Sequence, residues 1–126
     1  AAAIREDRAV IADQQIGRIL AHAPLDPDDG AWPHSALRDL IEQEWSDDLT
    51  HGFVLEQLVK RGPVQRAIYE GGDQEANLAT QARGWANTAG ARWHRTAEVL
   101  AKIADMWDAE SSRLDTDAKK RRIADE

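Results

Sequence analysis

The sequence predicts an all-α protein, a bundle of five to six helices with a long C-terminal helix. Apolar residues recur at three- and four-residue steps along most of the chain, which is the periodicity of a helix with one buried face. No stretch alternates apolar and polar residues as a strand does, and Val, Thr, Tyr and Phe are few. Proline and glycine interrupt the helical pattern at a few places, and these places separate the predicted helices.

The N-terminal part predicts two helices with a loop between them. The first helix covers residues 4–23, and its apolar face consists of Ala9, Ala12, Ile16, Ile19, Leu20 and Ala23. Pro24 ends this helix, and the proline-rich stretch 24–33 predicts a loop. Ser35 is suited to cap the second helix. The apolar face of that helix consists of Leu37, Leu40, Ile41 and Trp45.

The middle of the chain predicts two more helices. Ser46 or Asp47 is suited to cap a helix that passes through Leu55, Leu58 and Val59. Gly62 ends this helix, and Pro63 is suited to the first position of the next one. That next helix is short, because it passes through Val64 and Ile68 and reaches the Gly71-Gly72 pair after a few residues.

The C-terminal part predicts a helical pair. Asp73 is suited to cap a helix that runs to about Ala89 and is rich in alanine, so that a neighbouring backbone can approach closely. The final helix begins near Arg92 and extends almost to the end of the chain. Its heptad-like seam consists of Trp93, Ala97, Leu100, Ala104 and Trp107. The seam then thins to Ser111, Leu114 and Ala118, so we expect the last turns to be mostly exposed and to project from the body.

Length and composition favour one soluble domain. A chain of 126 residues can bury a sizeable core without covalent cross-links. The absence of cysteine excludes disulfides, thiolate metal sites and a cysteine nucleophile, and it is typical of the cytoplasm. The apolar runs are far shorter than the ~20 residues of a membrane span, and the N-terminus has no apolar signal-peptide core. Because the chain does not begin with Met, we expect it to be trimmed or to be part of a longer protein.

The charge is unevenly distributed. The formal net charge is −7, and residues 1–50 carry 11 acidic and 4 basic side chains. An acidic surface repels nucleic-acid phosphates and favours basic partners, although charge of this kind also serves solubility alone. The one basic cluster is Lys119 to Arg122. It lies near the end of the last helix, where cations suit the helix dipole, and nearby carboxylates nearly cancel its field.

The sequence contains no recognisable catalytic or metal motif. The nucleophile elbow, the Walker A loop and the dinucleotide-binding glycine pattern are all missing. The segment Asp26 to Gly30 resembles a calcium loop, but the ligand register of an EF-hand fails after Asp28. The histidines lack the zinc-protease spacing, which leaves two weak pairs, Asp48 with His51 and His94 with Glu98. We therefore predict no cofactor, no metal and no enzymatic activity.

Five tryptophans are the most unusual feature of the composition. Four of them, Trp45, Trp85, Trp93 and Trp107, lie on predicted apolar seams, where each can bury a large area in the core. Trp32 lies in the proline-rich loop instead. It either folds back over the core or stands exposed as an anchor for a binding partner.

Residues 83–118 resemble the C-terminal part of uncharacterised helical proteins of high-GC actinobacteria. The pattern is a Trp or Arg before "RTA", followed on one helix by "L..IA..W..E....D..A". A bias towards Ala, Arg and Asp agrees with it. The resemblance implies a bacterial, helical accessory domain and no assigned activity.

We predict a non-enzymatic module for protein–protein interaction or scaffolding, which binds a protein partner or itself. The candidate contact residues are Trp32, Asp28, Asp29, Leu114, Lys119, Lys120, Arg121 and Arg122. Three alternatives remain open. The first is an acidic antitoxin or immunity-like protein, and the second is a nucleic-acid-associated protein that uses the basic tail. The third is a metal-binding helical enzyme, which is supported only by the two weak histidine pairs.

Overall fold

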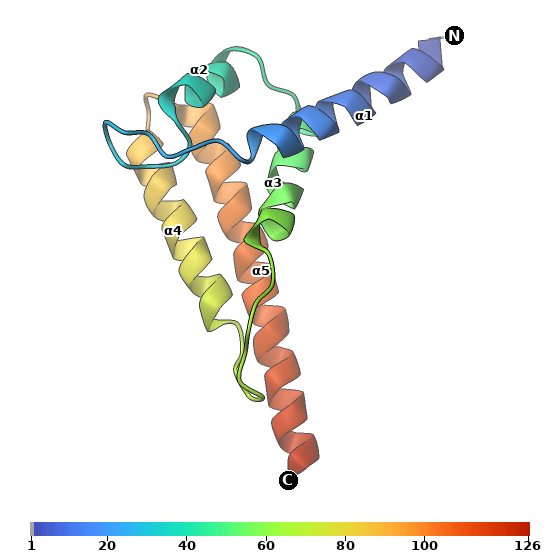
Figure 1. The fold of residues 1–126 in the computed structure, drawn as a ribbon, viewed down its shortest axis with the longest axis vertical. Coiled ribbons are helices and arrows are strands. Elements are labelled where there is room, and N and C mark those ends of the chain that lie inside the picture. Colours follow the sequence, from blue (N-terminus) through green and yellow to red (C-terminus); the bar gives the residue numbers. More distant parts are fainter. Residues whose placement is uncertain (1) are drawn as a thin grey trace.

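The computed structural model describes the chain from residue 2 to residue 126, with side chains from residue 7 onward. The described residues form five helices and no strand (Figure 1). The helices are α1 (Ala2–Leu20), α2 (Ser35–Gln43), α3 (Asp47–Arg61), α4 (Asp73–Ala89) and α5 (His94–Asp125). The prediction of an all-α bundle with a long C-terminal helix is therefore confirmed, since α5 spans 32 residues. No described helix has both the length and the apolar character that crossing a lipid bilayer requires.

The helices α4 and α5 form an antiparallel pair that serves as the frame of the molecule (Figure 1). The α4 side of their contact is made of small residues, the buried alanines Ala79, Ala82 and Ala89. Opposite them, α5 buries its predicted seam, including Leu100, Ala104 and Trp107. The small side chains at these three positions let the two backbones approach, as the alanine-rich sequence predicts.

The helix α2 is fixed across the N-terminal end of α5. The carboxylate of Glu42 accepts hydrogen bonds from the backbone N–H groups of Arg95 (3.0 Å) and Thr96 (2.8 Å). These N–H groups have no partner within their own helix, and α5 has no capping side chain of its own. Trp93, just before α5, adds a second contact with α2, because its indole N–H donates to Asp39. A residue far away in the sequence thus caps the longest helix of the protein.

The helices α1 and α3 cross at two glycines. A Cβ atom added to Gly17 would lie 3.0 Å from the Phe53 nitrogen, and one added to Gly52 would lie 2.8 Å from the Gln14 carbonyl carbon. Only glycine permits backbones to come this close. At the start of α3, Ser46 acts as the predicted cap, and its hydroxyl also donates to Asp13 of α1 at 2.9 Å.

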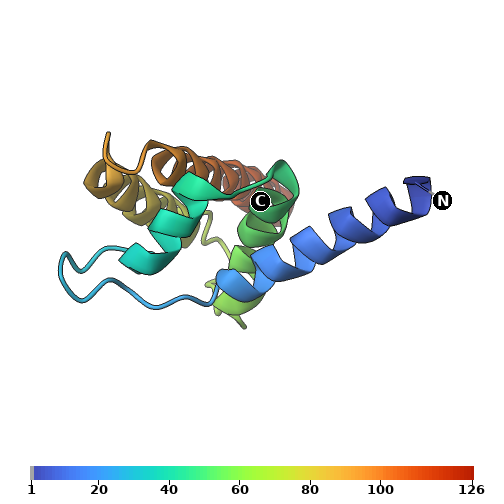
Figure 2. The same cartoon turned by 90° about the horizontal axis from the view of Figure 1, so that it is seen from above.

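Most of the apolar face predicted for the first helix is exposed, contrary to the amphipathic-bundle prediction, and only Leu20 and Ala23 at its C-terminal end pack against the core. Ile16 is 47% exposed and Ile19 is 71% exposed, while Ala9 and Ala12 are exposed as well. The glycine crossing explains this difference, because it turns the face of Gly17 towards α3 and leaves the face of the isoleucines outside. The N-terminal half of α1 projects away from the other helices, as two views at right angles show (Figures 1 and 2).

The predicted short helix through Val64 and Ile68 is wrong. Residues 62–72 form an irregular segment with one turn. Side-chain bonds specify this shape, since Arg66 donates to the Gly71 carbonyl oxygen at 3.2 Å. Two bonds then hold the end of the segment on α5. Ser111 donates its hydroxyl to the Gly72 carbonyl oxygen at 2.8 Å, and the Gly72 N–H donates to Asp115 at 2.7 Å.

Candidate functional site

The acidic loop before α2 is built around Asp26. This carboxylate is nearly buried and accepts the backbone N–H groups of Asp28 (2.8 Å), Asp29 (3.3 Å) and Ser35 (2.8 Å). These bonds, that from Asp28 first, hold the pKa of Asp26 well below its usual range. The oxygens that a calcium loop would aim at a cation are therefore used to fold the backbone.

The two candidate contact residues in this loop have different environments. Asp28 is exposed at the surface. Asp29 forms a bidentate ion pair with Arg38, at 2.6 and 2.9 Å. The Arg38 side chain is 1% exposed, and its guanidinium also lies over the Trp93 ring, 4.8 Å from the ring centroid. The hydrogen bond from Arg38 lowers the pKa of Asp29, so the carboxylate is an integral part of the loop.

Trp32 folds back over the core and is 4% exposed. Its ring stacks on Phe53, with centroids 5.2 Å apart, and its indole N–H donates to the Ala23 carbonyl oxygen at 2.7 Å. Of the two positions open from the sequence, the buried one is confirmed and the exposed anchor is wrong. The loop is ordered around this side chain rather than extended towards a partner.

Replacing Asp26 with Asn is expected to lower the melting temperature by about 5 °C. An amide has one acceptor oxygen, so its NH₂ group faces the N–H of Ser35 and one hydrogen bond becomes a clash of donors. Thermal unfolding followed by circular dichroism measures the change. The unmodified protein with about 1 mM Ca²⁺ is the companion sample, and we expect no change in its melting temperature. A calcium-dependent rise would revive the cation-loop interpretation.

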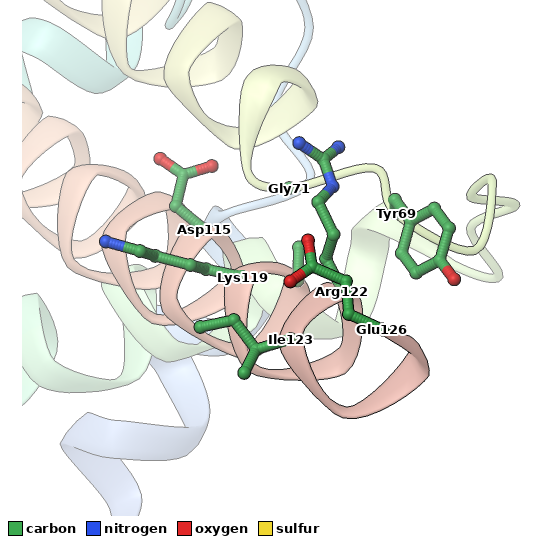
Figure 3. Close-up of a pocket in the computed structure, with 8 residues that line it drawn as sticks. Tyr69, Gly71, Asp115, Lys119, Arg122, Ile123 and Glu126 are labelled. Carbon is green, nitrogen blue, oxygen red and sulfur yellow. The ribbon is translucent and has the colours of Figure 1, made fainter.

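The basic cluster is divided between faces of α5. Lys119 and Arg122 line a groove of about 450 Å³ beside the irregular segment, together with Asp115 and Glu126 (Figure 3). Lys120 and Arg121 do not line it, and Arg121 donates to the carbonyl oxygen of Asp117 in its own helix. Leu114, the remaining candidate, is half-buried. Only two of the four cations therefore line this groove.

Several side chains that line the groove are engaged in contacts within the chain. Arg122 lies over the Tyr69 ring, 5.5 Å from the ring centroid, and the Tyr69 hydroxyl donates to Asp125. Asp115 is bonded to the Gly72 N–H. Two carboxylates and two cations line the groove, so its field is close to balanced, as the sequence predicts for this tail.

A buried ionic cluster lies where α3, α4 and the irregular segment meet, and no motif or spacing in the sequence predicts it. Glu75 is completely buried and pairs with Arg61 and Arg66. Burial alone would raise the pKa of Glu75. Hydrogen bonds from Arg66 and Arg61 outweigh burial and lower this pKa to about 2. The guanidinium of Arg61 also lies over the Trp107 ring, 5.1 Å from its centroid. The cluster stabilises the junction of these elements.

His94 and His22 each pair with a glutamate of another element, and the two pairs do not share a site. His94 lies beside Glu42 of α2, with 3.4 Å between its Nδ1 atom and a carboxylate oxygen. His22 is bonded to Glu56 at 2.7 Å, and Arg18 donates to the same carboxylate at 3.0 Å. Within the part of the chain that the structure describes, no three His, Cys, Asp or Glu side chains are grouped as a metal site requires.

Part of the apolar face of α1 is left uncovered by the other described residues. We call it the α1 seam and define it as Ala9, Ala12, Ile16 and Ile19. These residues follow steps of three and four, so they share one side of the helix. Contacts between α1 and the rest of the chain are made chiefly with α3. A row of this kind is typical of a helix that pairs with another helix.

Comparisons with known proteins add no relative. No protein-family model matches the chain, no curated protein matches its sequence, and no solved structure matches its fold. The resemblance of residues 83–118 to actinobacterial helical proteins therefore stays a prediction.

Proposed function

We propose that this chain is a non-enzymatic helical interaction module and that its α1 seam binds the α1 seam of a second copy. The observation that carries the proposal is the exposure of this row, with Ile19 at 71%. Burying an isoleucine side chain contributes about 1.5–3 kcal/mol, so two such residues from each copy supply a substantial driving force.

The exposure of residues 7–12 of α1 supports the proposal that this helix binds a partner. Residues 7–12 are all exposed, so this part of α1 has little packing within the described chain. An isolated helix shorter than about 12–15 residues is marginal in water, because helices in proteins are stabilised mainly by tertiary packing. A second helix along the α1 seam supplies that packing.

The charge and the side-chain sizes of α1 favour a second copy as the partner. The chain as a whole has a net charge of −7, whereas α1 carries three arginines and three acidic residues. Contact through α1 therefore joins neutral segments and keeps the acidic bodies apart. In an antiparallel pair, Ala9 faces Ile19 of the other copy and Ala12 faces Ile16. Each large residue meets a small one, as close helix packing requires.

Light scattering behind size exclusion, over a dilution series, tests the proposal. We expect a dimer that the double variant Ile16→Lys/Ile19→Lys weakens by at least about a hundredfold, because four buried isoleucines are lost per dimer. The matched control is Ile68→Lys/Ile123→Lys, which changes two isoleucines that are 71% and 61% exposed and lie outside α1. A protein that is monomeric at every concentration, or a control that dissociates equally, contradicts self-association through α1.

A further inference from the structure

A second cavity, separate from the α1 seam and from the groove of Figure 3, lies between α3, α4 and α5. Its volume is about 270 Å³. The apolar part of its lining comprises Leu78, Ala82, Trp85, Ile103 and Trp107. Trp85 is only half-buried, so an aromatic face is accessible from the cavity. Apolar walls with a few polar groups are typical of a site for a small molecule.

The charged side chains that line this cavity are both cations. Gln57, Lys60, Arg61 and Gln81 complete the lining, and it includes no carboxylate. This is unusual in a chain with a net charge of −7. The groove beside α5, by comparison, is lined by Asp115 and Glu126 as well as by cations. The charge of the cavity is therefore complementary to an anion.

Lys60 is the cation that lacks an anionic partner. Among the described side chains, no carboxylate oxygen lies within 4.0 Å of its ammonium group, whereas Arg61 is paired with Glu75. The ammonium donates to the Ala21 carbonyl oxygen at 2.9 Å and lies 4.3 Å from the centroid of the Trp32 ring. Although the residue is exposed overall, burial around the ammonium lowers the pKa of Lys60. A bound anion would stabilise the charged form of this amine.

We infer that this cavity binds a small aromatic carboxylate, with its ring against Trp85 and Trp107 and its carboxylate bonded to Lys60. A dry cavity of about 150 Å³ can hold benzene, so about 270 Å³ has room for one ring with a short acidic side chain. The carboxylate accepts a hydrogen bond from the ammonium of Lys60, which has donors beyond the one used by Ala21. The inference does not depend on self-association through α1.

Phenylacetate is the probe, and the indole N–H signals of Trp85 and Trp107 in NMR spectra are the readout. We expect both signals to shift with a dissociation constant of about 1 mM or tighter, which suits a ligand of this size. Phenylacetamide keeps the ring and lacks the charge, so we expect it to bind at least about tenfold more weakly. The variant Lys60→Gln is expected to weaken phenylacetate binding by a similar factor.

A matched pair of α4 variants separates a local effect from a general one. Gln81→Glu places a carboxylate at the cavity and is expected to weaken phenylacetate binding about fivefold. Asn77→Asp adds the same charge at an exposed α4 position outside the cavity lining and is expected to leave binding unchanged. Three results would overturn the inference. They are unshifted indole signals at about 10 mM phenylacetate, equal binding of the amide, or equal weakening by the two α4 variants.

Discussion

Replacing Gly52 with Ala is expected to lower the free energy of unfolding by about 2 kcal/mol. The added methyl group would overlap the backbone carbonyl of Gln14, and backbone atoms cannot rotate away as a flexible side chain can. Overpacking of this kind costs about 1–3 kcal/mol, and separating α1 from α3 adds lost contacts. The gain in helix propensity, about 1 kcal/mol, opposes the loss without cancelling it. Urea unfolding at one fixed protein concentration measures the difference.

Gly84→Ala is the control for this substitution. Gly84 also lies inside a helix, but a Cβ atom there meets nothing within 4 Å. Only the propensity change remains, so we expect this variant to be more stable by up to about 1 kcal/mol. Gly17→Ala, on the other side of the crossing, is expected to behave like Gly52→Ala. If Gly52→Ala matched the stability gain of Gly84→Ala, the close crossing of α1 and α3 would be disproved.

Replacing Glu75 with Gln is expected to lower the free energy of unfolding by about 3–5 kcal/mol. The carboxylate is completely buried between Arg61 and Arg66, whose side chains are 18% and 21% exposed. Removing one partner of a buried ion pair leaves charges in the interior without compensation. Glu70→Gln is the matched control, because Glu70 is partly exposed and its distance to Arg66 is longer, at 3.7 Å. For that surface pair we expect a loss of at most about 1 kcal/mol. Similar losses for the two variants would show that burial of Glu75 is unimportant.

The same carboxylate predicts how stability depends on pH. The pKa of Glu75 is lowered from 4.5 to about 2 in the folded chain. A lowered pKa means that the folded state binds the proton less readily than the unfolded state, so this stabilisation is complete above about pH 4.5. It is lost as the pH falls from about 4.5 towards 2. We expect the free energy of unfolding of Glu75→Gln to fall less steeply in this window, and parallel curves for the two proteins would contradict the assignment.

Much of the fold follows from local signals. The length of α5 and its buried residues agree with the heptad-like seam, because apolar periodicity over many turns has one helical solution. Pro24 separates two helices as predicted, and Ser46 caps α3. Two caps are displaced by one residue, since His34 precedes α2 and Gly72 precedes α4. Ends shift in this way because several neighbouring residues can satisfy the same N–H groups.

The candidate site was less predictable. The basic cluster and the acidic loop stand out by their composition, but composition does not reveal that the carboxylates of Asp26 and Asp29 are bonded within the fold. The cavity with Lys60 brings together three helices, and no spacing along the chain signals it. The pairing of Glu75 with Arg61 and Arg66 likewise joins separate elements, and no spacing along the chain signals it. Contacts of this kind depend on distances across the fold and leave no periodic trace.

Periodicity, helix propensity and helix-breaking residues are enough to predict the helical class, the long C-terminal helix and the residues that line its seam. Which apolar faces are covered depends instead on how the helices pack against one another. By its helix propensity alone, Gly17 weakens the helix in which it lies. In the folded chain, however, it permits the contact with α3 that orients α1 and leaves Ile16 and Ile19 exposed. The tertiary structure likewise placed Trp32 in the core, because its ring and its indole N–H both find partners there. Burial is a property of neighbours, and neighbours are set by packing between elements rather than by the order of residues within one.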